Sequence, residues 1–444
     1  MGGGAAGAVL AACGGSASPT AAPAATSPPP APPTKPAAVA TSAPVPTNAP
    51  AGATGATPAG GPATKPAGAV SPAATSATAA SAPAPAAPSA AAKPAANGTA
   101  APASAPAGIG LIKGPFPGEA QTLTGAGATF PAPLYTKWFD EYAKLTGVKV
   151  NYQAIGSGGG IKGITDGTVD FGASDGPMSD EQLKAAKGEI LHVPMTLGGV
   201  AVTYNVPEAK DPLKFTPETL PAIYLGTITK WNDPKLVADN PALASVNKDI
   251  VVVQRSDGSG TTYCFTDYLS SVSADWKSKV GRDTAVKWPV GIGGKGSEGV
   301  AGEVKQNPYS IGYVEVIYAI QNKLGTGLVK NAAGKFVEPK LDGVTAAAAA
   351  AADKVPADLR VSIVNQVGDG VYPISTFTWL LVYKNMADKA KATALTRLMW
   401  WATHDGQKFS TDLGYAPLPE AMVKKDEEKI NLVNVNDQKA FPGQ

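Results

Sequence analysis

The sequence is poor in cysteine and histidine and contains no long apolar run, and each scarcity excludes a class of protein. The 444 residues include two cysteines, Cys13 and Cys264, and two histidines, His192 and His404. Four scattered residues of these types provide neither a disulfide framework nor a His/Cys metal site. No stretch reaches the roughly 18 apolar residues of a membrane-spanning helix. We therefore expect no metal ion, no cofactor and no spanning segment.

The first quarter of the chain also lacks acidic and aromatic residues. In residues 1–112 the only charged side chains are Lys35, Lys65 and Lys93, and almost everything else is Ala, Pro, Ser, Thr or Gly. Such a segment cannot bury enough apolar surface to offset an ordering entropy of roughly 1–2 kcal/mol per residue. Its Ala-Pro and Pro-Pro steps favour polyproline II and oppose helix or sheet pairing. Residues 14–118 are therefore expected to form a disordered tether.

A short apolar segment at residues 4–12 has the length of a signal-peptide core and ends at a cysteine. The sequence Leu10-Ala11-Ala12-Cys13-Gly14 resembles the box at which bacterial lipoproteins are cleaved and acylated. No Lys or Arg precedes it, whereas signal peptides begin with a basic region, so a chance arrangement of Ala and Cys is the alternative. The resemblance implies a signal segment at residues 1–13 and a lipid anchor on Cys13.

The remainder of the chain alternates strand-like and helix-like patterns. Removing the three tail lysines from the net charge of +2 leaves −1, which argues against a nucleic-acid partner. Helices are predicted at residues 131–146, 259–270 and 389–403. Two more are predicted from their caps: one capped by Thr216 with Pro217 at its first position, and a surface helix at 345–353 capped by Thr345. Strands are predicted at residues 148–153, 169–173, 197–206, 250–254, 311–316 and 375–383. This alternation predicts an α/β fold with largely parallel strands.

Four loops place small and polar residues where a predicted strand meets a predicted helix: residues 125–130, 156–160, 173–175 and 255–261. In open α/β sheets, ligands lie at the carboxyl ends of the strands. Small residues let a ligand approach backbone N–H groups, and helix N-termini supply aligned donors. Together these loops predict an anion-binding site.

The fourth loop is the most informative of them. Arg255 ends an apolar strand, and Asp257 follows closely enough to hold its guanidinium in place. Arginine offers a rigid fork of donors that suits an oxyanion, and Ser259 and Thr261 add hydroxyl groups. The alternative interpretation is a structural Arg–Asp pair at a strand edge, beside a helix capped by serine.

Six segments of this part of the chain carry a recognisable pattern: Thr-Gly-Ala-Gly-Ala-Thr-Phe-Pro-Ala-Pro (124–133), Asn-Tyr-Gln-Ala-Ile-Gly-Ser-Gly-Gly-Gly (151–160), Val-Asp-Phe-Gly-Ala-Ser-Asp (169–175), Tyr-Leu-Gly-Thr-Ile-Thr-Lys-Trp-Asn-Asp (224–233), Arg-Ser-Asp-Gly-Ser-Gly-Thr (255–261) and Lys-Trp-Pro-Val-Gly-Ile-Gly-Gly-Lys-Gly (287–296). From about Leu123 onward the chain resembles the phosphate-binding proteins of PstS type that serve bacterial phosphate ABC importers. The resemblance implies a two-lobed type II periplasmic-binding-protein fold with a hinge. Lobe 1 would comprise residues 119–196 and 375–444, and lobe 2 residues 197–374.

The resemblance also implies where the ligand lies and what the protein does. Inorganic phosphate would be held in the cleft between the lobes by Thr129, the backbone N–H of Phe130, Ser157, Asp175, Arg255, Ser259, Gly260 and Thr261, with Asp257 orienting the arginine. The protein would be a monomeric, extracytoplasmic receptor that is not an enzyme. It would be anchored to the membrane through Cys13 and would deliver phosphate to permease subunits.

The residue types account for a phosphate preference in their own right. A buried Asp175 that accepts a hydrogen bond favours an oxyanion that still carries a proton at neutral pH, as phosphate does and sulfate does not. Two buried acceptors facing each other without a hydrogen cost several kcal/mol, so one carboxylate can discriminate strongly. Asp257 beside Arg255 offsets the cation and leaves hydroxyls and backbone dipoles to balance the anion.

Two other classes of function are weighed against this one. A phosphate-ester hydrolase is disfavoured because neither Ser157 nor Ser259 lies in a Gly-x-Ser-x-Gly turn and neither has an obvious histidine partner. The glycine-rich residues 291–296 are interpreted as a turn, because they fail the Walker pattern. A tethered surface interaction protein would need an exposed aromatic patch. The candidates for such a patch lie instead in apolar or family-like segments and are expected in the core: Trp231, Trp288 and Trp379.

Overall fold

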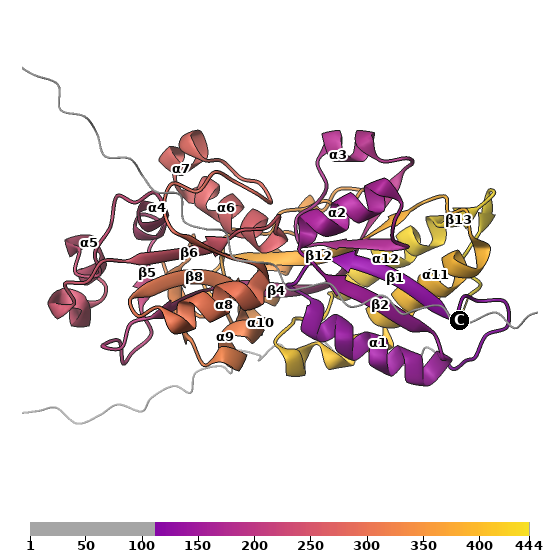
Figure 1. Cartoon of the computed structure of the whole chain (residues 1–444), viewed down its shortest axis with the longest axis horizontal. Helices are drawn as coiled ribbons and strands as arrows, with labels where there is room; N and C mark the ends of the chain where they lie inside the picture. Colours follow the sequence, from indigo (N-terminus) through magenta and orange to yellow (C-terminus); the bar gives the residue numbers. More distant parts are fainter. Residues whose placement is uncertain (1–111, 444) are drawn as a thin grey trace, which may run out of the picture. The chain divides into compact units, whose positions relative to one another are not determined.

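A computed structural model of the chain describes residues 112–443, whose principal feature is one mixed sheet of nine strands (Figure 1). In spatial order the sheet contains β2 (Lys149–Ala154), β1 (Thr122–Gly127), β3 (Phe171–Ser174), β12 (Ser375–Tyr383), β4 (Ile190–Asn205), β8 (Ser310–Glu315), β6 (Val251–Arg255) and β7 (Ile292–Gly294), with β9 (Gly325–Thr326) beside β4. The expectations for residues 1–13, for Cys13 and for residues 14–111 of the tether fall outside the described residues.

Two small sheets and the helices complete the described structure. The small sheets contain β5 (Lys214–Phe215), β10 (Leu328–Lys330) and β11 (Phe336–Val337), and β13 (Asn434–Val435) with β14 (Gln438–Lys439). The α-helices are α1 (Ala132–Thr146), α2 (Ser157–Asp166), α3 (Asp180–Ala185), α4 (Thr219–Tyr224), α5 (Pro234–Val237), α6 (Gly260–Val272), α7 (Ala274–Lys279), α8 (Gly296–Gln306), α9 (Val316–Asn322), α10 (Leu341–Ala350), α11 (Lys389–Thr403) and α12 (Glu420–Leu432).

The strand directions divide the main sheet into two outer parallel parts and an antiparallel centre. β1 pairs parallel with β2 and β3, and β6 pairs parallel with β7 and β8. β12 and β4 run antiparallel to each other and to their outer neighbours, β3 and β8. The expectation of largely parallel pairing is therefore wrong for the centre. Nearly every residue of β4 and β12 is buried, and a strand that is buried on both faces carries no alternation that reveals its direction.

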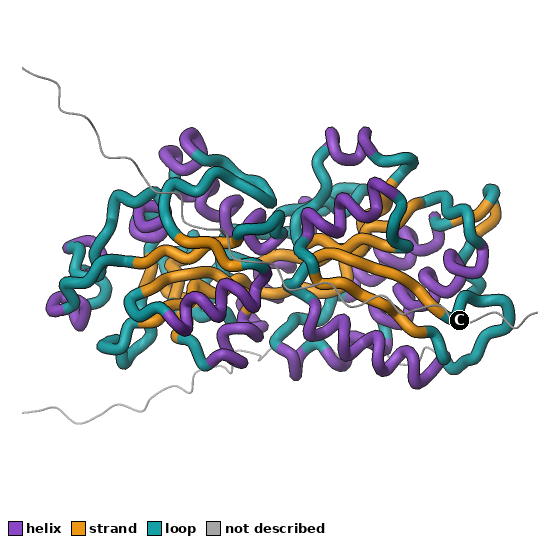
Figure 2. The backbone as a smooth tube through the Cα atoms, viewed as in Figure 1, coloured by secondary structure: helices purple, strands orange, loops and turns teal. Residues whose placement is uncertain are grey.

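β4 and β12 also connect the two lobes of the described structure. Lobe 1 contains β1, β2 and β3 with α1, α2, α11 and α12, and lobe 2 contains β6, β7 and β8 with α6, α8 and α9. The first part of β4 pairs with β12 beside β3, and its last part, from Val200 to Asn205, pairs with β8. Figure 2 shows these strands running through the middle of the molecule. The expected lobe boundaries, after residues 196 and 374, fall within β4 and at the start of β12.

Aromatic side chains fill much of the core. Trp231 and Trp379 are fully buried, whereas Trp288 is partly buried and packs against Tyr224 and Tyr313 with ring centroids 5.8 Å apart in each pair. Large rings contribute apolar area in proportion to their size, so these residues stabilise the fold. None of the three is strongly exposed, in agreement with a core role.

Two predicted helices begin elsewhere than expected. Helix α10 starts at Leu341 with Lys340 as its N-cap, so Thr345 lies inside the helix and caps nothing. The alanine run propagates a helix that is already nucleated upstream, because alanine has the highest helix propensity. Helix α4 starts at Thr219, after a turn in which Thr216 Oγ1 accepts a hydrogen bond from the Thr219 N–H at 3.1 Å.

The folded part begins earlier than the expected end of the tether at residue 118. Ile112 is buried, and the Phe116 ring lies 3.7 Å from the guanidinium carbon of Arg397. Arg397 Nε in turn donates to Glu119 Oε1 at 2.8 Å, and both side chains are buried. Residues 112–118 therefore pack on lobe 1. None of the described helices combines the length and the apolar character that crossing a bilayer requires.

Candidate anion-binding site between the lobes

The four loops rich in glycine and hydroxyl groups meet between the lobes. Residues 125–130, 156–160 and 173–175 lie at the carboxyl ends of β1, β2 and β3 of lobe 1, and residues 255–261 lie at the carboxyl end of β6 of lobe 2. Backbone contacts join the lobes here, because the Gly158 N–H donates to the Gly258 carbonyl at 2.9 Å. Parallel strands bring their carboxyl ends to one edge, and each lobe presents that edge to the other. The side chains gathered here are called the interlobe site below: Thr129, Ser157, Asp175, Arg255, Asp257, Thr261, Ser297, Glu315 and Thr378.

Arg255 and Asp257 form the charged pair of the interlobe site. Arg255 Nε and Nη2 donate to the two Asp257 carboxylate oxygens at 2.8 and 2.7 Å. Burial alone would raise the pKa of Asp257, but the hydrogen bonds and charge of Arg255 outweigh burial and lower it. The remaining nitrogen, Arg255 Nη1, lies 3.4 Å from Thr261 Oγ1 and 3.3 Å from Ser297 Oγ. The pair thus neutralises the guanidinium charge and directs one donor group toward two hydroxyls.

Asp175 is the buried acceptor of the interlobe site. Its side chain accepts hydrogen bonds from Thr378 Oγ1 at 2.8 Å and from Ser157 Oγ at 3.3 Å, and the residue is 1% exposed. Burial, followed by the negative charge of Glu315, raises the pKa of Asp175 to about 8. The hydrogen bonds from Thr378 and Ser157 and the charge of Arg255 oppose this rise and favour the ionised form, which is the form that accepts a hydrogen from a ligand.

Hydroxyl groups from both lobes lie against each other beside Arg255. Thr129 Oγ1 of lobe 1 lies 3.0 Å from Ser297 Oγ of lobe 2, and the Tyr318 hydroxyl donates to the Thr129 carbonyl at 2.7 Å. The Gly260 N–H donates to Ser157 Oγ at 2.9 Å, which adds a second contact between the lobes. The lobes are therefore closed on each other around a set of small donor groups.

Two of the expected contact residues, Ser259 and Phe130, also have structural roles. Ser259 Oγ accepts from the Thr262 N–H at 3.1 Å and thereby caps α6. The Phe130 ring packs edge-on against Tyr415 with centroids 5.9 Å apart, and within residues 112–443 the Phe130 N–H donates to no acceptor. The hydrogen bonds described above, together with the peptide link from Gly260 to Thr261, join Thr129, Ser157, Asp175, Arg255, Asp257, Gly260 and Thr261 into one cluster with Ser297, and Phe130 and Ser259 are chain neighbours of Thr129 and Gly260.

Three further residues complete the site and were missed by the sequence reasoning. Ser297 follows the glycine-rich turn, which proves to be β7 leading into the N-terminus of α8. Thr378 lies inside the predicted strand 375–383, where a threonine carries no functional signal. Glu315 ends β8, and its Oε1 lies 2.6 Å from Thr261 Oγ1. A lone acid at the end of an otherwise uncharged, buried strand was the available clue to Glu315.

The histidines lie outside the site and are bonded to other groups. His192 Nε2 accepts from the Met178 N–H at 3.0 Å, and burial lowers the pKa of His192 to about 3. His404 stacks on Trp400 and contacts the Glu427 carboxylate at 3.1 Å. Neither ring reaches Ser157 or Ser259, and the part of the chain that the structure describes holds no group of three His, Cys, Asp or Glu suited to a metal ion. Cys264 is buried, as a small apolar residue would be.

The arrangement suits an oxyanion. Helices α2, α6 and α8 all begin at the interlobe site, so their first-turn N–H groups supply partial positive charge without a net cation. The hydroxyls of Thr129, Ser157 and Ser297 add neutral donors, and Arg255 adds a charged one. Convergent donors together with one acidic acceptor can bind an oxyanion that carries a hydrogen.

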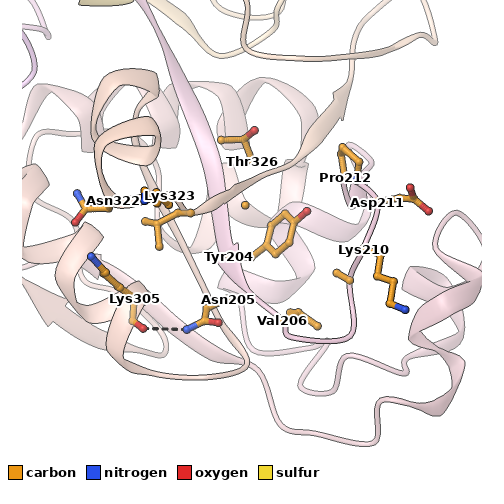
Figure 3. A pocket seen from close by; sticks show the side chains of 13 residues that line it. Tyr204, Asn205, Val206, Lys210, Asp211, Pro212, Lys305, Asn322, Lys323 and Thr326 are labelled. Atoms are coloured by element: carbon orange, nitrogen blue, oxygen red, sulfur yellow. Dashed lines mark hydrogen bonds between the residues drawn. The ribbon is translucent and has the colours of Figure 1, made fainter.

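An open groove of the described residues lies elsewhere. It measures about 640 Å³ and is bordered by the end of β4, by Lys210, by Lys305 and by the end of α9 (Figure 3). Because β8 runs antiparallel to β4, this groove lies at the opposite end of β8 from Glu315. Its lysines are exposed, and Figure 3 shows them pointing in different directions, so no built site is present there.

Comparisons with known proteins agree with this geometry. A family profile described as "PBP superfamily domain" matches residues 60–401. The chain is 46% identical over 306 residues to the phosphate-binding protein PstS of Haemophilus influenzae, covering 69% of this chain and 91% of the relative. It is 47% identical over 309 residues to PstS of Pasteurella multocida, covering 69% and 89%. A crystal structure of the phosphate-binding protein from Stenotrophomonas maltophilia matches with a TM-score of 0.54 at 17% identity, over 73% of this chain and 100% of that one, and supports the fold.

Proposed function

Since this chain belongs to the PstS family of phosphate-binding proteins, we propose that it captures inorganic phosphate between its lobes and delivers it to a phosphate ABC importer. The family has the type II periplasmic-binding-protein fold and consists of solute-binding proteins rather than enzymes, so no catalytic reaction is assigned to the chain. The observation that carries the proposal is a buried carboxyl, Asp175, facing hydroxyl and N–H donors beside a neutralised arginine.

The contacts to phosphate follow from the donors of the interlobe site. Arg255 Nη1, the Thr129 and Ser157 hydroxyls and the free N–H of Phe130 would donate to unprotonated phosphate oxygens. The N–H groups at the start of α6, including Gly260 and Thr261, would donate from the opposite lobe. Several convergent neutral donors can balance a dianion without a matching cation.

Asp175 would set the preference for phosphate over sulfate. At neutral pH phosphate keeps a hydrogen that it can donate to Asp175, whereas sulfate presents only acceptors. Burial excludes water from the contact, so two facing acceptors would remain unsatisfied and cost several kcal/mol. Calorimetric titration of the purified protein with phosphate, sulfate, molybdate and a sugar phosphate tests this proposal. Strong binding of phosphate alone is expected, and equal affinity for sulfate would contradict it.

Binding and release require the lobes to part and close. The Thr129–Ser297, Tyr318–Thr129 and Gly158–Gly258 contacts would break on opening, and movement would be concentrated in β4 and β12. Small-angle scattering with and without phosphate measures this change, and a smaller radius of gyration is expected with phosphate. Identical curves would contradict hinge closure.

The protein would act outside the cytoplasm as a monomer held at the membrane by a lipid on Cys13. The support is the Leu10-Ala11-Ala12-Cys13 sequence, and residues 14–111 would form the tether between anchor and receptor. Mass spectrometry of protein extracted from membranes tests the anchor, because acylation adds a defined mass to an N-terminal Cys13. Replacement Cys13→Ala should release the protein from the membrane fraction without affecting phosphate affinity.

A further inference from the structure

Glu315 is a second buried carboxyl of the interlobe site, and the proposed contacts to phosphate do not include it. It is the last residue of β8 and is 1% exposed. Its Oε1 lies 2.6 Å from Thr261 Oγ1, and within residues 112–443 its Oε2 has no hydrogen-bond partner. An ionised carboxylate with a bare buried oxygen is costly, whereas a protonated carboxyl tolerates the same surroundings more easily.

The charges of the interlobe site disfavour an ionised Glu315 when an anion is bound. The guanidinium of Arg255 is already engaged by Asp257. Asp175 and Glu315 are contacted by hydroxyl groups instead of cations. With both acids ionised, a doubly charged oxyanion would join two uncompensated negative charges in a buried space, where Coulomb repulsion is only weakly screened.

The hydrogen-bond inventory of Thr261 identifies which proton state supports binding. A threonine hydroxyl has one hydrogen and two lone pairs. If Glu315 is ionised, Thr261 must donate its only hydrogen to Glu315 and present a lone pair to the anion. If Glu315 is protonated, Thr261 accepts from Glu315 and from Arg255 Nη1, which lies 3.4 Å away, and its own hydrogen is free for the anion.

We propose that Glu315 takes up a proton from solvent when phosphate binds and donates it in a hydrogen bond to Thr261, which thereby directs its hydroxyl hydrogen at the anion. This inference rests on the proposed function and makes Glu315 a positioning residue that acts through Thr261. The two acids of the site would then have different roles. Asp175 accepts a hydrogen bond from the ligand, and Glu315 orients the Thr261 hydroxyl that donates to the ligand.

The surroundings of Glu315 agree with this proton state. Burial raises its pKa, while the Thr261 hydrogen bond, the Arg255 charge, the nearby Ser297 hydroxyl and the Glu315 backbone N–H oppose the rise without cancelling it. The acid Asp175, whose pKa is itself raised, adds a like charge when ionised. The titratable and charged groups that face Glu315 from the elements around it are Arg255, Asp175, Cys264, Tyr318 and Tyr415. Burial raises the pKa of the thiol and of both phenols, so these three stay neutral.

Phosphate affinity as a function of pH tests the inference with the full chain, measured by calorimetry between about pH 7 and pH 10. Proton uptake by Glu315 should make the wild-type affinity fall toward the alkaline end by up to tenfold per pH unit, on top of the change from Asp175, whose pKa is raised to about 8 and which titrates in the variant as well. In Glu315→Gln the side-chain amide donates to Thr261 at every pH, so the Glu315 part of the slope should disappear while affinity near pH 7 stays within about threefold of the wild type. Asp426→Asn is the matched control, because Asp426 is a fully buried acid on α12, outside the interlobe site, and the variant should follow the wild-type profile.

A second readout is the number of protons taken up on binding, obtained from calorimetry in buffers of different ionisation enthalpy. Glu315→Gln should take up fewer protons than the wild type, and Asp426→Asn the same number. A Glu315→Gln profile with the wild-type slope and proton number would overturn the inference. So would a loss of affinity above about tenfold near pH 7 with an unchanged melting temperature of the phosphate-free protein. If the wild type binds phosphate in either case, only the role of Glu315 fails; if it binds none at any pH, the proposed function fails with it.

Discussion

Gly260 of lobe 2 lies so close to Asp175 of lobe 1 that a Cβ atom added to the glycine would stand 2.5 Å from the Asp175 backbone nitrogen. Real Cβ atoms do not approach a backbone atom this closely, so a side chain at residue 260 would force the lobes apart. The closed arrangement therefore depends on the absence of one methyl group. Because Gly260 also begins α6, its small size serves both closure and the approach of an anion to the helix N-terminus.

Gly260→Ala should weaken phosphate binding by at least about tenfold without destabilising the phosphate-free protein, because alanine is favourable in a helix and the clash arises only on closure. Calorimetry gives the affinity and thermal unfolding gives the stability. Gly302→Ala is the matched control, since Gly302 lies in α8 with no atom within 4 Å of its added Cβ. Normal affinity in Gly260→Ala would show that closure tolerates the methyl group.

Asp175→Asn should reduce the preference for phosphate over sulfate by about tenfold or more, because the amide offers a hydrogen to an oxyanion that has none. The ratio of the two calorimetric affinities is the measurement. Asp170→Asn is the control. Asp170 directly precedes the first residue of β3, whereas Asp175 directly follows the last one, and the Asp170 carboxylate pairs with Lys391 Nζ at 2.9 Å. An unchanged ratio in Asp175→Asn would remove this residue from selectivity.

Arg255→Ala should weaken phosphate binding by at least about 2 kcal/mol, the scale of a lost charge-assisted hydrogen bond. Arg255→Lys should not restore the affinity for phosphate. A lysine ammonium cannot donate to both Asp257 carboxylate oxygens and also direct a further donor at the ligand. Arg282→Ala, which removes a half-exposed arginine paired with Asp267, should leave affinity unchanged. A loss well below 2 kcal/mol in Arg255→Ala would favour a purely structural Arg–Asp pair.

His192 should make the folded state sensitive to acid. Its pKa is lowered to about 3 by burial, so below its ordinary value of 6.5 the unfolded chain binds a proton that the folded protein does not. Stability is therefore complete above about pH 6.5 and is lost as the pH falls toward 3. Between pH 7.5 and 4.5 this group should cost about 3 kcal/mol of unfolding free energy, measured by urea denaturation. His192→Gln should lose that much less over the same interval, and equal losses in both proteins would exclude His192 as the cause.

The sequence predicts local elements well where the pattern and the boundary signals agree. Residues 375–383 and 389–403 have the bounds of β12 and α11, because an apolar run and a helical repeat each end at clear polar boundaries. Whether β12 pairs parallel or antiparallel to its neighbours could not be predicted from the sequence, because a strand that is buried on both faces has the same apolar pattern in either orientation. Thr345 is not a cap because the helix begins upstream at Leu341, and Gly343, a poor helix former, obscures this start in the sequence.

The residues of the candidate site also differ in how well the sequence predicts them. Arg255, Asp257 and Thr261 stand together in one loop and can be recognised from their spacing, whereas Ser297, Glu315 and Thr378 reach the site from three other elements. Thr378 bonds Asp175 across more than 200 positions of sequence, and only the pairing of β12 with β3 brings the two together. Long-range register is what a single sequence leaves unspecified.

Because β4 pairs with β12 in lobe 1 and with β8 in lobe 2, the two lobes share this strand. If the chain were cut between the lobes, each fragment would lose strands that cover its hydrophobic core. We therefore expect that neither lobe folds stably on its own. Because β4 and β12 are joined along the length of β12 by backbone hydrogen bonds, we expect the lobes to open by a twist of these two strands rather than by their separation.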